Sequence, residues 1–415
     1  MPRDDLFDEQ MTYPFPTDRP EVVAVESSST GGKDVRDSER RFPGCGGVYL
    51  LTDEADRVIL LSSAADMRRA LGHRLLEATA ELAEPTEGSD SGHPRRSRLR
   101  LNLHEIVRRI RWKRADSPFE LNYEYLRIAR ELIPKEYLAN LAFGPAWFIH
   151  ADPASAIPRF SVGTWLIDPC SHDLGPFPTQ AAANRFVQVL QDIFDLCRYE
   201  YILEKTPHGQ ACAYFEMGKC PAPCDGSLPM ALYREMVRAA WAFASGQRAE
   251  QLSDWQARMA SAATRQEYEY AGHFKQILLR AREMVQESYR YVRPVKDFNY
   301  LVVQRVGGRR RVKPFFIRKG WITPGEAVAL KDLDRATAEW SAAIAGPLAV
   351  AADAVDESSL RLRSEHIWLV SHYLFKRESP GWFIHQSDLT APESLAAEIR
   401  ARLRNEHDPG SYKTD

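Results

Sequence analysis

The hydrophobic pattern of the first half of the chain predicts a mixture of strands and helices. Apolar residues at 48–51 and the segment VILLSS at 58–63 are separated by a short polar turn, which predicts a β-hairpin. Two more strands are expected at 146–151 and 159–167. Apolar residues at helical spacing predict amphipathic helices within 64–84 and 178–197.

The second half begins with helical patterns and then changes character. A helix is expected over 230–246, and the polar helical region 250–290 divides near 265–267, which predicts an antiparallel helix pair. Beyond Pro294, two strand patterns within 298–322 are joined by a Gly-Gly pair, a signal for a second hairpin. Further helical stretches are expected at 364–375 and at the C-terminus.

These patterns predict an α+β, multidomain protein. A chain of 415 residues is long enough for two to four domains. Residues 1–40 are rich in Asp, Pro, Ser and Glu and have no hydrophobic period, which is typical of a disordered tail. The expected divisions are 1–40 (disordered tail), 41–165 (α/β domain), 166–248 (cysteine-rich helical region), 249–290 (helical hairpin) and 295–415 (small C-terminal domain with a β-hairpin and helices).

The net charge of −2 does not by itself indicate a nucleic-acid-binding protein. The longest apolar run, 342–352, is broken by a Gly-Pro pair and is too short to span a bilayer. The first residues are acidic where a signal peptide needs basic and then apolar residues. We therefore expect a cytoplasmic protein that does not enter a membrane and whose thiols stay reduced.

Four of the six cysteines lie within 28 residues, three of them in the segment CAYFEMGKCPAPC. The spacing is Cys197-x14-Cys212-x7-Cys220-x3-Cys224. Four thiolates can hold a [4Fe–4S] cluster or a tetrahedral zinc ion. The alternative is four unrelated buried cysteines, and the spacing alone leaves iron–sulfur and zinc open.

The segments GPFPTQAAANRFVQVLQDIFDLC and CAYFEMGKCPAPCDG resemble the UvrC family of the bacterial UvrABC excision-repair nuclease. That family has a Gly-Pro-Phe helix start, a leucine-rich helix that ends in cysteine, and then a C-x7-C-x3-C segment. The resemblance implies that Cys197, Cys212, Cys220 and Cys224 bind a [4Fe–4S] cluster, with zinc as the alternative. Full-length family members continue into an RNase-H-like domain, so the sequence resembles a short form without it.

The segment 252–284 resembles the UVR motif, a helical hairpin that docks onto a matching hairpin of UvrB in the same repair system. The Glu-Phe-Glu turn of the family corresponds to Glu267, Tyr268 and Glu269 here. An aromatic anchor flanked by charges suits a small interface with a buried centre and a polar rim. The alternative is an ordinary amphipathic helix pair that packs on its own protein.

Residues 43–134 occupy the place of a GIY-YIG endonuclease domain in the family. Tyr49 and Arg68 match two residues of the nuclease centre. The second tyrosine of the family falls at Leu60, and the metal-binding glutamate falls at Ala129. Because Leu cannot transfer a proton and Ala cannot bind a metal, we expect a retained scaffold with a vestigial, inactive centre. Mg²⁺ would be needed only if the nuclease is active.

Other acidic residues do not restore that centre in an obvious way. Glu131 is two residues beyond Ala129, which turns its side chain about 200° around a helix, and Glu124, five residues earlier, is about 140° round the axis. His104 and Glu105 form a dipeptide that is more often a solvated pair than a metal site.

Two basic segments predict contact with DNA phosphates. Trp112 and Trp321 could stack on unpaired bases. The alternative is a solvated charged face with both tryptophans in the core. The candidate DNA-binding residues are Arg95, Arg96, Arg108, Arg109, Arg111, Arg309, Arg310 and Arg311.

The leading hypothesis is therefore a UvrC-like protein of nucleotide excision repair that binds a UvrB-like protein and DNA without cutting. The first alternative is an active GIY-YIG-type endonuclease that makes an incision in damaged DNA with non-standard residues. The second is a zinc-stabilised scaffold without a role at DNA.

Overall fold

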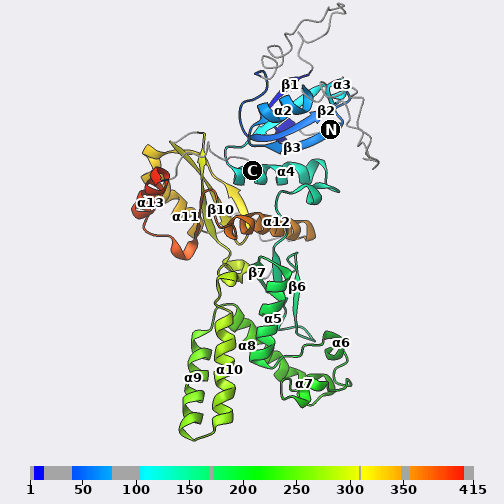
Figure 1. The fold of residues 1–415 in the computed structure, drawn as a ribbon, viewed down its shortest axis with the longest axis vertical. Helices are drawn as coiled ribbons and strands as arrows, with labels where there is room; N and C mark the ends of the chain where they lie inside the picture. Colours follow the sequence, from blue (N-terminus) through cyan, green and yellow to red (C-terminus); the bar gives the residue numbers. More distant parts are fainter. Residues whose placement is uncertain are drawn as a thin grey trace, which may run out of the picture. The chain divides into compact units, whose positions relative to one another are not determined.

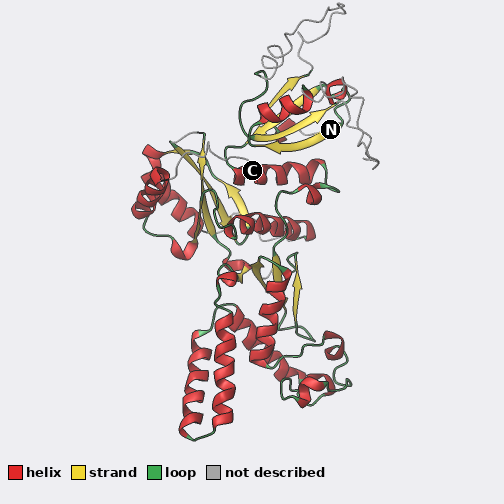
Figure 2. Cartoon of the chain, in the orientation of Figure 1, coloured by secondary structure: helices red, strands yellow, loops and turns green. Residues whose placement is uncertain are grey.

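The structure of the chain is a computed structural model that describes residues 4–13, 40–76, 103–167, 172–307, 310–346 and 356–405. It is a mixed helix and sheet protein with two compact units (Figures 1 and 2). The first unit comprises Met1–Ala142 with Gln304–Arg311, and the second comprises Phe143–Val303 with Val312–Asp415. Within the described ranges, no helix is both long and apolar enough to cross a membrane.

The first unit is built on an antiparallel sheet with the strand order β1-β4-β2-β3. The hairpin expected within 48–63 is present as β2 and β3, and all six residues of β2 are buried. Burial on both faces explains the continuous apolar run at 48–51. The strands are β1 (Glu9–Thr12), β2 (Gly47–Thr52), β3 (Val58–Ala64) and β4 (Arg109–Arg114).

Three helices accompany this sheet: α2 (Met67–Leu75), α3 (Leu103–Ile106) and α4 (Pro118–Leu132). Polar side chains cap two of them, because Asp66 accepts from the amide of Arg69 and Ser117 accepts from the amide of Glu120. The buried face of α2 packs on β2 and β4 in one apolar core. Helix α4 packs against β2 and β3.

The structure corrects the expectation that all of 1–40 is disordered. Residues 4–13 form a 3₁₀ turn, Asp4–Leu6, and strand β1, which pairs with β4. Leu6 and Tyr13 are buried, and the Tyr13 hydroxyl donates to the carbonyl of Leu75 at 3.3 Å. Apolar side chains spaced across these ten residues provide enough burial to order them. The remainder of the expected tail, 14–39, lies outside the described residues.

The second unit contains a four-stranded sheet with the order β6-β5-β7-β8. Its strands are β5 (Trp147–Ala151), β6 (Phe160–Gly163), β7 (Asp173–Phe177) and β8 (Arg293–Pro294). The boundary expected at 165 therefore differs from the observed one, since β5 pairs with β7, which follows that boundary in sequence. The predicted amphipathic helix is α5 (Gln180–Phe194), and its apolar face packs on this sheet.

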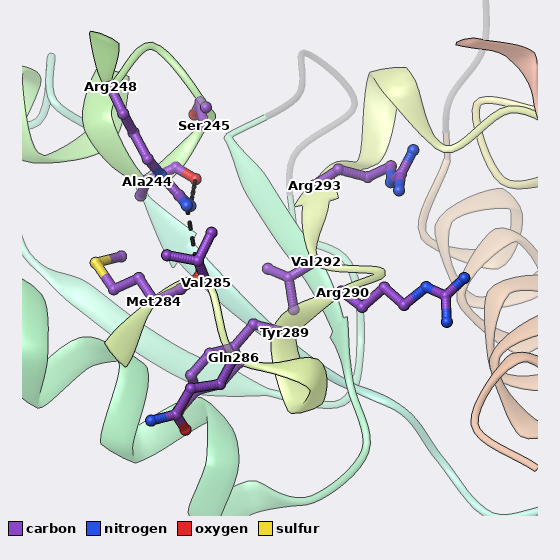
Figure 3. Close-up of a pocket in the computed structure, with 11 residues that line it drawn as sticks. Ala244, Ser245, Arg248, Met284, Val285, Gln286, Tyr289, Arg290, Val292 and Arg293 are labelled. Atoms are coloured by element: carbon purple, nitrogen blue, oxygen red, sulfur yellow. Dashed lines mark hydrogen bonds between the residues drawn. The ribbon is translucent and has the colours of Figure 1, made fainter. Parts of the chain in front are cut away.

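Three more helices extend from this sheet: α8 (Met230–Ala244), α9 (Ala249–Thr264) and α10 (Tyr268–Glu283). The pair α9–α10 is the helical hairpin predicted for 250–290, and α10 also packs on α5 (Figure 1). Arg248 ties the ends of α8 and α10 together (Figure 3). Its guanidinium donates to the carbonyls of Phe243 at 3.0 Å, Ala244 at 3.4 Å and Met284 at 3.4 Å.

The C-terminal region contains a five-stranded sheet in which β11, β10, β9 and β13 are consecutive neighbours and β12 pairs with β10. Helices α11 and α13 pack on it through an apolar core that includes Trp340 and Leu395. The strands are β9 (Tyr300–Val306), β10 (Arg311–Arg318), β11 (Trp321–Pro324), β12 (Val328–Ala329) and β13 (Trp382–His385). The helices are α11 (Leu333–Ala345), α12 (Glu357–Leu374) and α13 (Pro392–Asn405).

Candidate functional site: the cysteine loop and its connections

The four clustered cysteines lie on one irregular loop between α5 and α8. Cys197 follows the end of α5, Cys212 precedes the short helix α7 (Ala213–Glu216), Cys220 is buried, and Cys224 lies in a 3₁₀ turn (Pro223–Asp225). A second short helix, α6 (Glu200–Leu203), occupies the segment after Cys197. The loop thus carries cysteines that are far apart in the segment on the same supporting helices, α5 and α8.

A backbone contact closes this loop. The amide of Gly209 donates to the carbonyl of Cys224 at 2.8 Å. A Cβ atom at position 209 would lie 2.8 Å from the same carbonyl oxygen, which is closer than side chains approach. Glycine at this position therefore lets the segment before Cys212 lie directly against Cys224.

The thiols of the loop act on one another electrostatically. Cys220 hydrogen-bonds the sulfur of Cys197, and this bond lowers the pKa of Cys197 and raises that of Cys220. Negative charge on Cys224 or Cys212 raises the pKa of Cys197 in turn. Burial, assisted by Asp225, raises the pKa of the Cys224 thiol. The other three sulfurs therefore lie within electrostatic reach of Cys197.

The donor set of the loop fits a metal–sulfur group, but the side chains are not gathered into a ligand shell. All four cysteines are free thiols, as cysteine ligands must be before they bind metal. Among the described residues, however, no three His, Cys, Asp or Glu side chains are placed to hold a metal ion. Closure of a shell would thus need side-chain rotation within the loop.

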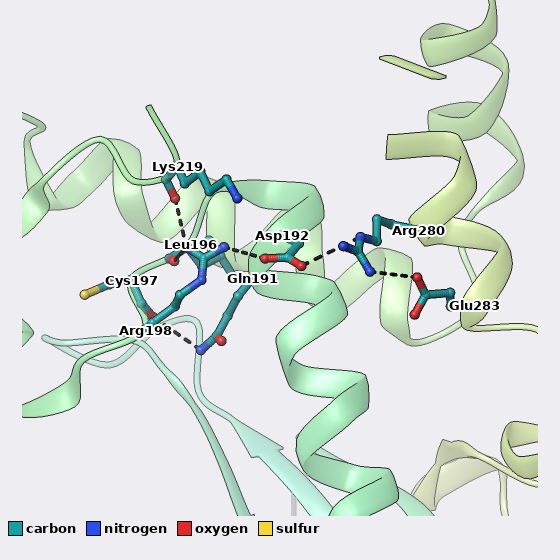
Figure 4. Close-up of polar contacts among 8 residues, drawn as sticks. All are labelled: Gln191, Asp192, Leu196, Cys197, Arg198, Lys219, Arg280 and Glu283. Carbon is teal, nitrogen blue, oxygen red and sulfur yellow. Dashed lines mark hydrogen bonds and ion pairs between the residues drawn. The ribbon is translucent and has the colours of Figure 1, made fainter. Parts of the chain in front are cut away.

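Arg198 anchors the cysteine loop to α5 (Figure 4). Its guanidinium pairs with Asp192 at 2.6 Å and donates to the carbonyl of Lys219 at 2.9 Å, so it joins α5 to the segment just before Cys220. It also lies over the ring of Tyr214, 4.4 Å from the centroid. A single side chain beside Cys197 thereby positions residues that flank Cys212 and Cys220.

Asp192 connects the same network to the α9–α10 hairpin. Arg280 of α10 lies 3.8 Å from the second carboxylate oxygen of Asp192 and pairs with Glu283 at 2.9 Å (Figure 4). Burial opposes ionisation of Glu283, but hydrogen bonds from Arg185 and Arg280 lower its pKa below the usual range. These charges form a continuous path from the cysteine loop across α5 to α10.

Helix α8 supports the loop from its other side. The amide of Cys197 donates to the hydroxyl of Tyr233 at 3.1 Å, and Tyr233 is almost completely buried. Burial raises the pKa of this tyrosine far above its ordinary value, so its hydroxyl stays neutral. Tyr233 belongs to an apolar cluster with Leu196, Leu203 and Val237 that fixes the loop on α8.

The turn of the α9–α10 hairpin exposes the predicted partner-binding residues. Tyr268 begins α10 and is 70% exposed, a large value for an aromatic side chain. Glu267, the residue before it, pairs with Arg265 at 3.0 Å, and Glu269 is exposed. The hydroxyl-bearing ring is therefore presented to solvent between charged neighbours.

The expected vestigial nuclease residues lie in the first unit. Tyr49 is buried on β2 within the core shared with α2, and its cross-strand partner is Ser62. Leu60 lies opposite Leu51 in the same hairpin, and Ala129 is completely buried on α4. Arg68 is exposed on α2 and donates to the carbonyl of Phe42 at 3.1 Å.

The acidic alternatives to Ala129 are dispersed. Glu124 is buried on α4 and pairs with Arg127 at 2.9 Å, whereas Glu131 is exposed near the end of the same helix. Glu105 is exposed on α3, and the neighbouring His104 shares a 2.5 Å hydrogen bond with the Tyr13 hydroxyl. No carboxylate of the described chain is gathered with others in a metal-binding group.

The structure changes the set of candidate DNA contacts on β4. Arg111 is buried and lies 3.3 Å from Asp56, so it is outside the exposed surface. Arg109 also pairs with Asp56, while Arg108 is exposed just before β4. β4 lies between β1 and β2, and both of its faces are covered over 110–112, which takes Arg111 of this basic run inward.

The second basic segment remains on the surface where it is described. Arg310 and Arg311 are exposed at the start of β10. Arg95, Arg96 and Arg309 lie outside the described residues. Of the two tryptophans, Trp112 is buried in the core of the first unit, which overturns its expected role in base stacking. Trp321 is half-buried and packs edge-on against His366.

Sequence reasoning missed the arginines at the base of the hairpin. Arg248, Arg290 and Arg293 line a common cavity, although more than 40 positions separate the first from the last. These arginines come together because the end of α10 lies beside the end of α8. No local sequence pattern indicates such a cluster. The Asp192–Arg280 contact was missed for the same reason.

Comparison with known proteins matches the segment that carries the cysteine loop. Residues 147–243 match the family described as UvrC/Cho excinuclease, middle domain. This range contains β5, β6, β7, α5, the cysteine loop and nearly all of α8, whereas β8, which completes their sheet, lies outside it. No solved structure matches the chain.

Similarity extends beyond this domain. UvrABC system protein C of Citrifermentans bemidjiense is 25% identical over 291 residues, which are 69% of this chain and 43% of that protein. Its counterpart in Syntrophus aciditrophicus is 26% identical over 306 residues, or 72% of this chain and 45% of that protein. The chain is thus similar to UvrC proteins across the matched middle domain and beyond it, and it spans less than half the length of these relatives.

Proposed function

We propose that the chain is a protein of nucleotide excision repair that works with DNA and a UvrB-type protein and does not itself cut DNA. The observation that carries this proposal is the cysteine loop: four free thiols lie on one support within the matched middle domain. The relatives are named as part of a UvrABC system. Such a protein could recruit or compete with a catalytic subunit.

The cysteine loop would hold a [4Fe–4S] cluster through Cys197, Cys212, Cys220 and Cys224. When bound, the cluster supplies metal–thiolate bonds that cross-link the two ends of the loop. Arg198 and Tyr233 hold the loop near that state, because they fix the backbone on both sides of Cys197. The thiol–thiol hydrogen bond between Cys197 and Cys220 already joins two of the four donors.

The α9–α10 hairpin would act as a UVR-type docking element for the UvrB-type partner. Support comes from the exposed ring of Tyr268 at a two-helix turn with charges on either side. Tyr270, two residues further along, is also exposed, and aromatic side chains in a polar surround are typical of binding hot spots. The charge path through Asp192 places this element in contact with the support of the cysteine loop.

The first unit would keep the GIY-YIG scaffold without its chemistry. Leu60 has no proton to transfer, and Ala129 is buried in α4 with no atom that could bind a metal. Exposed arginines such as Arg108 and Arg310 would contribute sequence-independent contacts with phosphates.

An incision assay separates this proposal from its alternatives. The chain is incubated with Mg²⁺, a damaged duplex and the other proteins of a UvrABC system, and strand cleavage is followed by gel. We expect DNA and partner binding without cleavage by this chain. Cleavage that is lost in Glu105→Ala or Glu131→Ala would instead establish an active endonuclease and locate its metal.

A further inference from the structure

A cavity of about 310 Å³ opens where α8 and α10 end and the chain turns toward β8 (Figure 3). The charged residues in its lining are all cationic. Three arginines, Arg248, Arg290 and Arg293, contribute to the wall together with Ser245 and Gln286, and none of the lining residues is Asp or Glu. The net positive charge of this lining favours an anion over a cation.

The charge of Arg248 is not neutralised locally. Its guanidinium donates to three backbone carbonyls, and burial lowers its pKa. Within the described part of the chain it has no carboxylate partner. The hydroxyl of Ser245 beside it is buried and makes no hydrogen bond to a described residue. This wall therefore holds one positive charge and one unused hydroxyl.

Two more arginines contribute to the lining, and in Figure 3 their side chains extend together to one side, away from Arg248. Arg290 lies over the ring of Tyr291, and Arg293 lies over the ring of Tyr300, 5.3 and 5.5 Å from the centroids. Glu287 pairs with Arg290 at 3.1 Å, but both side chains are largely exposed, so the pair is weak. The three arginines thus have one paired carboxylate, Glu287, while Asp388 acts on Arg290 only through its charge.

We propose that this cavity binds phosphate groups of a DNA backbone. The guanidinium fork matches the geometry of phosphate oxygens, and a cavity of this size accepts a phosphate with part of its sugar. The inference deepens the proposed function and rests on its DNA partner. It places DNA at the root of the hairpin that carries Tyr268, so one element would bind DNA at its base and a protein at its tip.

The test measures DNA binding by the full-length protein. A fluorescent duplex of arbitrary sequence is titrated at several salt concentrations, and the dissociation constant is taken from anisotropy. Arg290→Gln/Arg293→Gln should raise this constant about ten-fold and reduce the salt slope by up to about two, because each lost phosphate contact removes nearly one released counterion. Arg248 is left intact because it joins α8 to α10.

Two matched variants sharpen the result. Glu287→Gln removes the one carboxylate that pairs with Arg290, so it should tighten DNA binding two- to three-fold. Arg258→Gln removes an exposed arginine of α9 that pairs with Asp254, and it should leave both the affinity and the salt slope unchanged. Far-ultraviolet circular dichroism verifies that each variant keeps its helices.

The outcomes separate this inference from the proposed function. If the wild type binds DNA and the double variant binds equally well with the same slope, the cavity proposal is wrong and the repair function stands. If the wild type binds no DNA, the proposed repair function is wrong. Titration with ADP and with inorganic phosphate then tests the cavity proposal by itself. If calorimetry detects binding to the wild type that is lost in the double variant, the cavity is still a phosphate site. If calorimetry detects no binding to the wild type, the cavity proposal is wrong.

Discussion

Arg198 and Asp192 form an ion pair of 2.6 Å that joins the cysteine loop to α5. Both residues have second partners, the carbonyl of Lys219 for Arg198 and the guanidinium of Arg280 for Asp192. The side chain of Arg198 is mostly buried, so water screens this pair little. The loop and the α9–α10 hairpin therefore share one carboxylate, and a change at Asp192 should reach both.

Replacement of Asp192 by Asn should loosen the loop even without a cofactor. A charge-assisted hydrogen bond in this setting contributes about 1 kcal/mol to local stability, or about five-fold in an opening equilibrium. Hydrogen exchange of the amides at 198–219 should accelerate by that factor. Arg238→Gln, which removes an exposed pair with Glu235 on α8, is the control and should leave exchange unchanged. Equal protection in Asp192→Asn would show that the pair does not hold the loop.

Replacement of a single loop cysteine should abolish the proposed cluster. Anaerobically purified wild-type protein should absorb at about 400 nm and contain iron, whereas Cys220→Ser should lose the absorption because one of four thiolates is missing. Cys45→Ser is the matched control, since Cys45 is a free thiol in the first unit. Zinc without visible absorption would favour the scaffold alternative. Full iron content in Cys212→Ser, Cys220→Ser and Cys224→Ser would contradict the ligand assignment.

Much of the local structure was predictable from the spacing of apolar residues. Helix α5 and the pair α9–α10 follow a period of 3.6 residues that is set by burial of one face, whereas the hairpin β2–β3 was indicated by apolar runs on either side of a polar turn. The segment 4–13 was missed because its few apolar residues lie among acids, and only its pairing with β4 shows what they cover.

Contacts between distant segments were beyond the reach of the sequence. One partner of β7 is β8, which follows it by more than 100 residues, so this edge of the sheet has no local signature. The same limit applies to Arg111, which seemed a surface cation until its register on β4 placed it beside Asp56. Cysteine spacing predicted a possible set of four metal ligands, but the closeness of Cys197 to Cys220 depends on how the loop between them folds.

Loss of the exposed ring at the hairpin turn should weaken binding of a UvrB-type protein. Tyr268→Ala should cost at least about 1 kcal/mol, a five-fold or larger rise in the dissociation constant measured by calorimetry. Leu279→Ala removes an exposed apolar side chain from the same helix, far from the turn, and should change binding little. An equal loss in both variants would indicate a general effect on α10, and no loss in Tyr268→Ala would remove the docking proposal.

Stability of the second unit should fall as the solution becomes acidic below about pH 6.5. Burial, together with the positive charge of Lys376, lowers the pKa of His372 on α12 below its ordinary value of about 6.5, and burial also lowers that of His385. Because the folded state binds fewer protons than the unfolded state, their contribution is complete above pH 6.5. It is lost as the pH falls from 6.5 through the folded pKa values.

The measurement that checks this pH dependence is a titration of the histidine ring protons by nuclear magnetic resonance. We expect a pKa for His372 below 6.5 in the folded protein, and Lys376→Gln should raise it because a neighbouring cation is removed. In parallel, the urea midpoint of the His372→Gln variant should decline less between pH 7 and pH 5.5 than that of the wild type. A folded pKa at or above 6.5 would reverse the sign of the linkage and contradict the prediction.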